Sequence, residues 1–432
     1  MDRVDPPGRA VSQHELELLE HLVGEVRPAY LEDLATLVNI DSGSYTKTGV
    51  DRVGRWTRLF LERLGGDVEV HPHPTLGETV VGTFEGAPGG LRLLLIGHMD
   101  TVFDEGTAAA RPFGLKGGRA HGPGVTDMKS GLLTGLYGLL ALRGLHEETA
   151  ARDGQGPLPF ERLTFIANPD EEIGSPTSTP IIRDVARTVD ACFVLECARA
   201  NGDIVSARKG ILDARLTVHG RAAHAGVEPE KGRSAILAAS QLVPALHGLT
   251  GRWPGVTCNV GVIAGGTRPN VVPEEARLEI DLRAVTREDL EAAEAGLRGL
   301  IAAPAVPDVT IEMEPMARWW PMEKLERSGR LVDLAVGLAG RLGFELHDTA
   351  TGGASDANTT AGMGVASLDG LGPIGGMDHS PEEYLEVDSI VPRTTLFAAL
   401  LLAVARDPVV AGWRHAAPTD AAPAPLAGGP RT

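Results

Sequence analysis

Histidine and acidic residues recur in this chain just after apolar runs that predict β-strands. In the string GHMDTV, His98 and Asp100 stand two residues apart, so in an extended backbone both side chains project to the same side. A carboxylate placed beside an imidazole in this way can fix the tautomer of a metal-binding histidine. Glu171 and Glu172 follow a second apolar run, and Glu196 ends a third. Because open α/β sheets build their sites at strand ends, these residues are candidates for one common site.

Two further candidates, Asp127 and His379, lie at the start of a long helical pattern and after a glycine-rich stretch. Taken singly, such motifs have plain structural interpretations: a surface turn, a helix cap, an exposed acidic loop or a structural histidine. As a set, two imidazoles and three carboxylates are the donors that two borderline-soft cations require when one carboxylate bridges them. A spare carboxylate can then serve as the base, and Glu171 beside Glu172 supplies that pair.

Strands alternate with helical patterns over the first two hundred residues. Apolar periodicity predicts helices at 13–38, 52–64 and 128–145. Short β-rich runs predict strands at 79–84, 91–96, 163–167 and 191–195. Such alternation, with some runs apolar throughout, is typical of an α/β sheet covered by helices on both faces.

A second region begins near residue 211 and has the pattern of a small two-layer αβ domain. Strands are predicted at 211–218, 256–264 and 275–284, and helices at 233–248 and 287–302. Helical patterns then return at 327–342 and 388–406. We therefore predict a catalytic domain, formed by residues 1–211 and 322–406, that is interrupted by an inserted lid at 212–321 and followed by a flexible tail at 407–432.

Composition narrows the range of partners. The 432 residues include 40 Lys and Arg against 58 Asp and Glu, a net charge of −18 that repels phosphate backbones and anionic lipids. We therefore expect no nucleic-acid or membrane partner. Three cysteines without a CxxC pair predict reduced thiols, and Met1 to Val23 lacks the unbroken apolar core of a signal peptide. These features predict a soluble, cytoplasmic protein.

Six strings resemble the motifs of one enzyme family and occur in the same order as in that family. The similarity extends from about residue 28 to residue 406. The strings are GHMDTV, GPGVTDMKSG, NPDEEIGS, VLE, HGRAAHAG and DHS. The family is that of the dizinc amidohydrolases, which includes glutamate carboxypeptidase, aminoacylase, acetylornithine deacetylase and succinyl-diaminopimelate desuccinylase. The layout is most similar to the glutamate carboxypeptidase type. The resemblance implies a zinc-exopeptidase-like α/β domain, with a mixed sheet covered by helices, and an inserted two-layer α+β dimerisation lid.

The same resemblance implies roles for the candidate site residues. It implies two Zn²⁺ per subunit with five ligands: His98 and Glu196 at one ion, Glu172 and His379 at the other, and Asp127 between them. Asp100 matches the residue that orients the first histidine, and Glu171 matches the general base. The bond between Asp127 and Met128 matches a cis peptide of the family. Co²⁺ or Mn²⁺ could occupy the same ligands.

The lid carries the remaining matches. The resemblance implies a homodimer in which His224, from HGRAAHAG, enters the partner subunit's site and stabilises the oxyanion. Asn270 and Arg283 match residues that hold the substrate carboxylate, and the planar fork of arginine suits a carboxylate. A surface salt bridge is the alternative for Arg283. Gly353 lies where the backbone would approach that carboxylate, and Ala354 replaces a glycine common in relatives.

Cys197 and the pair Trp319-Trp320 also depart from the expected pattern. Cys197 stands where relatives often have proline, and beside a complete ligand set we expect no catalytic use of its thiol. Trp319 and Trp320 are unusual in a chain so poor in aromatic residues. They predict either core residues of the domain junction or a wall that contacts an aromatic acyl group.

The sequence thus predicts hydrolysis of an amide or peptide bond in a small molecule or short peptide with a free carboxylate. Water activated between two zinc ions would attack the carbonyl, and Glu171 would move the proton. One alternative keeps this chemistry with another substrate, as an N-acyl amino acid deacylase or a biosynthetic deprotecting amidohydrolase. A non-catalytic protein that binds amides is the other alternative, and the complete ligand set argues against it.

Overall fold

The computed structural model describes residues 10–153 and 158–414, which divide into two compact units. Unit 1 contains the described residues up to 206, together with 324–350 and those from 355 onward. Unit 2 contains 207–323 and 351–354. Of the predicted tail, 407–432, residues Pro408–Ala411 form helix α11, and 415–432 lie outside the described residues.

Unit 1 is built on a mixed sheet with the order β1-β2-β6-β3-β7-β14. The strands are β1 (Asp67–His71), β2 (Thr79–Glu85), β3 (Arg92–His98), β6 (Arg162–Asn168), β7 (Ala191–Val194) and β14 (Ala366–Leu368). β6, β3, β7 and β14 run parallel to one another, whereas β1 and β2 pair antiparallel to their neighbours. β3 is buried along nearly its whole length, as expected for a central strand with both faces covered.

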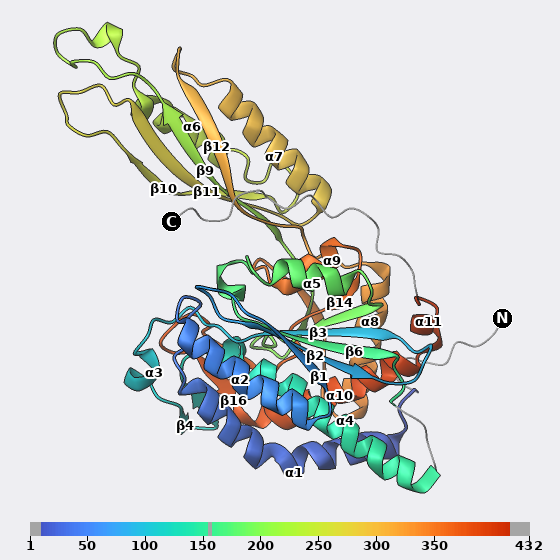
Figure 1. Ribbon diagram of the computed structural model, residues 1–432. Helices are drawn as coiled ribbons and strands as arrows, with labels where there is room; N and C mark the ends of the chain where they lie inside the picture. Colours follow the sequence, from blue (N-terminus) through green and yellow to red (C-terminus); the bar gives the residue numbers. More distant parts are fainter. Residues whose placement is uncertain (1–9, 154–157, 415–432) are drawn as a thin grey trace. The chain divides into compact units, whose positions relative to one another are not determined.

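Helices cover both faces of this sheet (Figure 1). On one face lie α1 (Gln13–Val38), α2 (Lys47–Arg63), α4 (Gly131–Asp153) and α10 (Ile390–Arg406), and α1, α4 and α10 contact one another. On the other lie α5 (Thr179–Ala186) and α9 (Asp356–Gly362). α8 (Glu326–Arg341) contacts α10 and β14, and α3 (Thr107–Ala110) is a single turn. The predicted α/β class is therefore confirmed.

α10 belongs to the interior of unit 1. By length and composition, the segment Val387–Arg406 passes a test for a membrane-spanning helix, but 83% of its apolar window is buried inside the protein. It packs between α1, α4 and α8 as a core helix does.

A smaller sheet in unit 1 holds the loops near the predicted site. Its order is β15-β16-β5-β4, formed by β15 (Gly375–Gly376), β16 (Tyr384–Glu386), β5 (Arg119–His121) and β4 (Gly114–Lys116). A short helical segment, η1 (Val125–Ser130), follows β5 and leads into α4. The two strands β8 (Ile204–Arg208) and β13 (Asp348–Thr351) pair separately.

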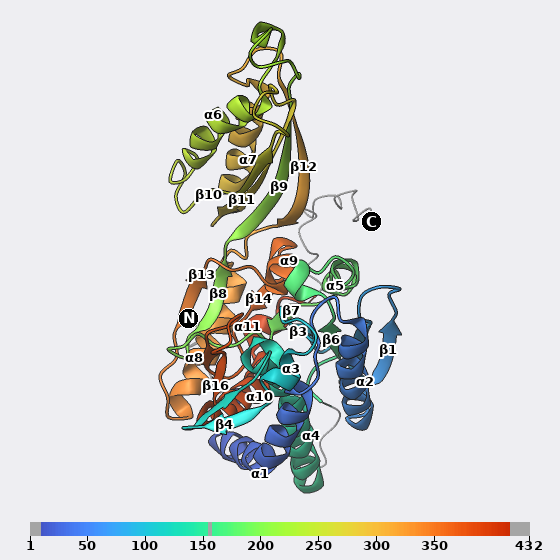
Figure 2. The same ribbon diagram turned by 90° about the vertical axis from the view of Figure 1, so that its left-hand side faces the viewer.

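Unit 2 is a two-layer domain. Its antiparallel sheet has the order β10-β11-β9-β12, formed by β9 (Gly210–His219), β10 (Thr257–Gly265), β11 (Glu275–Ala284) and β12 (Thr310–Trp319). Helices α6 (Ala235–His247) and α7 (Arg287–Ala302) contact one face of it (Figure 2). Side chains along β9 alternate between buried and half-buried, as expected for a sheet covered on one face.

Most predicted elements agree with the structure, but two helices differ in their start and several elements were not predicted, among them β1, β8, β13, β14, α5 and α9. The helix predicted at 52–64 begins earlier, at Lys47. The helix predicted at 128–145 is η1 followed by α4, with non-helical backbone at Asp127 and Met128. β12 was not predicted, because the run at 310–319 alternates exposed and half-buried residues and contains a proline. All three cysteines are free, as predicted, and the structure shows that they are also buried.

Candidate metal centre

The predicted site residues of unit 1 converge at the carboxyl ends of three neighbouring parallel strands. β3 ends at His98, β6 ends just before the loop that carries Glu171 and Glu172, and Glu196 follows β7. Because β6, β3 and β7 are adjacent and parallel, their ends lie at one edge of the sheet. The topology therefore brings together residues that are up to a hundred positions apart in the sequence.

Asp127 lies between the two histidines. One carboxylate oxygen, Oδ1, is 3.0 Å from Nε2 of His98, and the other, Oδ2, is 3.0 Å from Nε2 of His379. The peptide bond between Asp127 and Met128 is cis, as the family resemblance implied. This carboxylate thus faces both imidazoles at once, the position of a bridging ligand.

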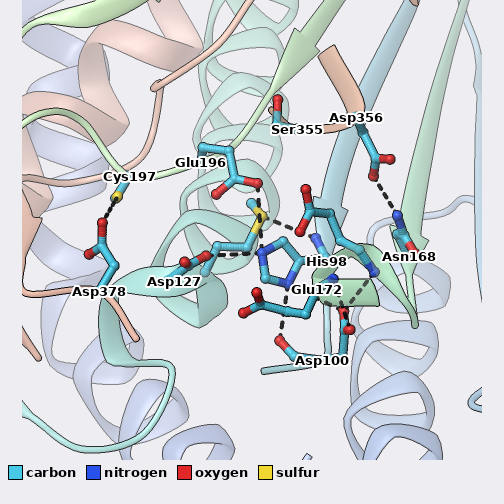
Figure 3. Close-up of polar contacts among 12 residues, drawn as sticks. His98, Asp100, Asp127, Asn168, Glu172, Glu196, Cys197, Ser355, Asp356 and Asp378 are labelled. Atoms are coloured by element: carbon cyan, nitrogen blue, oxygen red, sulfur yellow. Dashed lines mark hydrogen bonds and ion pairs between the residues drawn. The ribbon is translucent and has the colours of Figure 1, made fainter. Parts of the chain in front are cut away.

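The carboxylates of Glu172 and Glu196 are the remaining donors, and both lie close to His98 (Figure 3). Oε2 of Glu172 is 3.1 Å from Nε2 of His379, and Oε1 of Glu196 is 3.6 Å from Nε2 of His98. Potential ligand atoms of His98, Glu171 and Glu196 all lie within 4.8 Å of one another, as do those of His98, Asp127 and Glu172.

Asp100 supports both the first histidine and the acidic loop. His98 lies with Nδ1 3.0 Å from the main-chain oxygen of Asp100 and 3.4 Å from its carboxylate. The same fully buried carboxylate accepts hydrogen bonds from the backbone N–H groups of Glu171 (3.1 Å) and Glu172 (3.2 Å) and from the hydroxyl of Ser44 (2.6 Å). Asp100 therefore positions the backbone that carries two candidate site residues, beyond the predicted contact with the histidine.

Only two of the three adjacent acidic residues take part. The carboxylate of Asp170 instead accepts hydrogen bonds from the backbone and hydroxyl of Thr177 and from the hydroxyl of Ser178. The start of the same loop is held by Asn168, whose amide donates to Asp356. Burial raises the pKa of Asp356 to about 6. The acidic run is thus a fixed turn that directs Glu171 and Glu172 toward the histidines.

The electrostatics of the site favour a bound cation. Burial acts against a charged His98, yet the nearby carboxylate of Glu196 and hydrogen bonds to Asp100 and Asp127 raise its pKa well above the usual value. Burial also raises the pKa of Glu171 well above its ordinary value. For Asp127, burial is outweighed by hydrogen bonds from the two histidines, which lower its pKa. Several carboxylates buried this close together repel one another, which raises the free energy of the folded state unless a positive charge neutralises them.

The donor set fits two zinc-like ions. Within the described residues, Oε1 of Glu172 is buried and makes no hydrogen bond, so one carboxylate oxygen is left for a ligand. Imidazole nitrogens and carboxylate oxygens are ligands that Zn²⁺ accepts, and the side chain of His379 is 54% exposed, which leaves an approach from solvent. The arrangement can hold a water between two cations and place a carboxylate, Glu171, beside it.

In unit 2, the predicted lid residues fall into two separate groups. His224 and Asn270 are exposed neighbours: the bridge His224–Val271 and a hydrogen bond from Ala225 N–H to the Asn270 carbonyl join their loops. In the β9–β11 register, His219 pairs with Glu275 near these loops.

The second group lies at the opposite end of β11. Arg283 pairs with Ile211, eight register steps from the end where His219 lies. At about 3.4 Å per residue these ends are about 27 Å apart. The guanidinium of Arg283 binds Asp281 and donates to the carbonyl of Gly352 at 2.7 Å, while the carbonyl of Gly353 accepts from Arg208 at 3.2 Å. Within one lid, Arg283 therefore cannot hold a small carboxylate together with Asn270. Whether it binds substrate stays a prediction.

The structure explains two of the unusual residues, Cys197 and Trp320. Burial raises the pKa of the Cys197 thiol well above its usual value, which disfavours a nucleophilic role, and its sulfur lies 3.7 Å from Asp378. Trp320 is 8% exposed and belongs to the core of unit 2, with Arg287 and Arg318 over its ring. It is therefore a core residue of that unit.

Sequence reasoning missed several residues that hold the site. Ser44, Asp356 and Glu383 are buried and bind the loops that carry the candidate ligands. None of them follows an apolar strand in a motif, so their positions carried no signal in the sequence. Asp356 lies close in sequence to Gly353, and Glu383 lies close to His379, but neither is part of a recognised motif.

Comparisons with known proteins identify the family of this chain. Residues 206–309 match the M20 family model of a peptidase dimerisation domain. The chain is 31% identical over 404 residues to carboxypeptidase G2 from Pseudomonas sp. (strain RS-16), covering 91% of this chain and 94% of that protein. It is 29% identical over 287 residues to acetylornithine deacetylase from Proteus mirabilis, covering 61% of this chain and 70% of the relative.

Solved structures share the fold. The aminopeptidase PepT from Bacillus cereus matches with a TM-score of 0.68 at 20% identity, covering 91% of this chain and 99% of that one. An M20 family metallo-carboxypeptidase from Sulfolobus solfataricus matches with a TM-score of 0.65 at 15% identity, covering 86% and 98%.

Taken together, the donor set, the fold and these relatives define a metal-dependent hydrolase of peptide or amide bonds. The chain belongs to the M20 family of metallopeptidases and amidohydrolases. The predicted family and the prediction of an enzyme are confirmed.

Proposed function

We propose that this enzyme is a dizinc amidohydrolase of the glutamate carboxypeptidase type. It would release a carboxylate-bearing amino acid, such as glutamate, from a small acyl or peptidyl substrate. The observation that carries the proposal is the position of Asp127, whose two oxygens each lie 3.0 Å from a different imidazole. Similarity to carboxypeptidase G2 along nearly the whole of both chains supports the substrate class.

The chain's own residues divide the work as follows. His98 and Glu196 would hold one ion, Glu172 and His379 the other, with Asp127 between them. Two zinc ions there supply a polarised substrate carbonyl and a water of lowered pKa. The carboxylate of Glu171 lies within 4.8 Å of the ligand atoms of His98 and Glu196. Because Glu171 binds no metal in this assignment, its carboxylate accepts the proton from the attacking water. It then returns that proton to the nitrogen of the leaving amine.

The proposal includes a homodimer formed through the lid. β10 is one of the two edge strands of the lid sheet, and its Val262 and Ile263 are 49% and 53% exposed. An exposed apolar edge strand readily pairs with another chain. His224 and Asn270 lie at one end of the lid and Arg283 at the other. We therefore propose that His224 and Asn270 act in the partner subunit's site.

The test is metal analysis joined to a substrate panel. Wild-type protein should contain two metal ions per chain, lose activity on exhaustive chelation, and regain it with Zn²⁺. Glu171→Gln should keep both ions while hydrolysis falls by about a hundredfold or more, because a positioned general base contributes about 10²–10⁴-fold. Glu382→Gln, at an exposed position of the same chemistry, is the matched control. Full activity in Glu171→Gln would contradict the proposal.

The panel decides the substrate. N-acyl glutamates, dipeptides and acetylated amino acids are compared by kcat/KM. We expect preference for a free carboxylate beside the scissile bond and for glutamate as the leaving amino acid. Higher kcat/KM on acetylated amino acids would instead identify an N-acyl amino acid deacylase. The three free, buried cysteines are compatible with a cytoplasmic location, which is included in the proposal.

A further inference from the structure

Glu383 holds the loop that carries Asp127. Its side chain is 1% exposed and lies in the segment just after His379. One carboxylate oxygen, Oε1, accepts the backbone N–H groups of Thr126 (2.8 Å) and Asp127 (3.0 Å), and the other accepts that of Gly124 (2.9 Å). Three backbone donors of one short loop therefore converge on a single buried carboxylate.

The loop is built to receive an anion. Gly124 has φ +71°, a left-handed conformation that turns neighbouring N–H groups to one side and forms a concave anion-binding nest. A side chain at this position would also collide with Thr101. The neighbouring N–H groups have Glu383 as their acceptor, so this carboxylate fills the nest from within the protein. Hydrogen bonds from N–H groups to a charged carboxylate are the stronger kind.

The same segment is tied to this loop by further contacts. The hydroxyl of Thr126 donates to the carbonyl of Tyr384 at 2.6 Å, and Nδ1 of His121 lies 3.1 Å from the carbonyl of Glu383. His379 is only four residues upstream of Glu383. The loops that carry His379 and Asp127 are therefore joined through Glu383 and its neighbour Tyr384.

We propose that Glu383 is a positioning residue of the metal centre: by holding the backbone of Asp127 it sets the separation between the Asp127 carboxylate and His379. The inference rests on the proposed two-ion site. Residues that orient ligands without touching the metal typically change metal affinity by about 10–100-fold when altered. The ion held by Asp127, Glu172 and His379 should depend on Glu383 the more strongly, because both loops contribute to that ion.

The experiment is a Zn²⁺ titration of the metal-free protein by calorimetry against a competing chelator. Glu383→Gln keeps the size of the side chain but places an amide NH₂ where an oxygen accepted a backbone N–H. We expect the affinity for one ion to fall by about tenfold or more, with a smaller change in the affinity for the other ion. Glu382→Gln is the matched control, since Glu382 is exposed; it should bind both ions as the wild type does. Thermal unfolding of the metal-free variants is measured in parallel to show that each variant is folded.

The outcomes separate the two proposals. If the wild type fails to bind two ions, the proposed function is wrong. If the wild type binds two ions and folded Glu383→Gln binds them with unchanged affinity, the role of Glu383 is wrong. A lowered melting temperature with unchanged affinities would make Glu383 a purely structural residue and would also overturn the inference. If Glu383→Gln does not fold, Glu383→Asp, which keeps the charge on a shorter side chain, is judged by the same criteria.

Discussion

Replacing Asp100 by asparagine tests how the acidic loop is held. In the structure, Oδ1 accepts the N–H of Glu171, while Oδ2 accepts the N–H of Glu172 and the hydroxyl of Ser44. Asparagine has one acceptor oxygen and one NH₂ group, so one of these two positions must face backbone donors with another donor. The side chain is fully buried, and no bulk water can replace the missing acceptor.

The magnitude follows from the less costly orientation. With NH₂ in the place of Oδ1, the hydrogen bond from Glu171 and the 3.4 Å contact with Nδ1 of His98 are lost. A hydrogen bond to a charged group contributes about 1.5–3 kcal/mol. A buried donor left without an acceptor costs a further 1–3 kcal/mol or so, of which relaxation of the loop recovers a fraction. If the active conformation of the acidic loop loses about 3 kcal/mol of stabilisation in this way, kcat/KM decreases roughly 100-fold.

The assay is kcat/KM on the best substrate of the panel, with metal content measured on the same samples. Asp104→Asn is the matched control, because this aspartate is exposed and close in sequence. Ser44→Ala removes one hydrogen bond to the same carboxylate without adding a buried donor, so it should reduce activity less, by about tenfold, which is the effect of the lower end of this range, about 1.5 kcal/mol. If Asp100→Asn stays within about threefold of wild type, the argument that Asp100 positions the acidic loop is refuted.

Three further predictions concern other regions of the chain. Burial and the like charge of Asp281 raise the pKa of Asp213 to about 6. The charged side chain therefore destabilises the folded state. This destabilisation is absent below the pKa of the unfolded chain and complete above the pKa of the folded chain. Because Asp213 is partly exposed, Asp213→Asn should stabilise by only about 1 kcal/mol near pH 7.5, and the gain should shrink toward about pH 5 in denaturant melts. Gly131→Ala would push a methyl into a backbone carbonyl and should destabilise the protein by about 1–3 kcal/mol. Gly329→Ala in α8 has open space around it and should stabilise the protein by about 0.5–1 kcal/mol. An equal effect of the two substitutions in thermal melts would contradict the packing argument. Ile263→Glu on β10 should convert a dimer to a monomer in light scattering, and a variant that stays dimeric would remove β10 from the proposed interface.

The fold could be predicted in outline because its hydrophobic periodicity is strong. Helix α1 and helix α7 occupy the predicted 13–38 and 287–302, where apolar residues repeat at helical spacing. β12 was missed because an edge strand with a half-exposed pattern and a proline lacks that signal. The short strands of the small sheet were missed for a related reason: two or three residues are too few to show a period.

The candidate ligands were available to sequence reasoning because each follows an apolar strand or lies in a distinctive motif. Their supporting residues were not. Glu383 and its exposed neighbour Glu382 have the same chemistry and adjacent positions, yet only Glu383 is buried against the Asp127 loop. Nothing in the local sequence separates two adjacent glutamates, because the difference arises from a loop more than 250 residues away.

The linear order of residues thus determined which chemistry this chain could perform: two imidazoles and several carboxylates at strand ends, and a lid inserted between two halves of an α/β domain. Tertiary structure alone decided which oxygen of Asp127 meets which histidine, that Asp170 turns away from the site, and that Arg283 and Asn270 lie at opposite ends of one sheet. The physical reason is that residue type and periodicity are local properties, whereas the direction and partners of a buried polar group depend on segments that only the folded chain brings together.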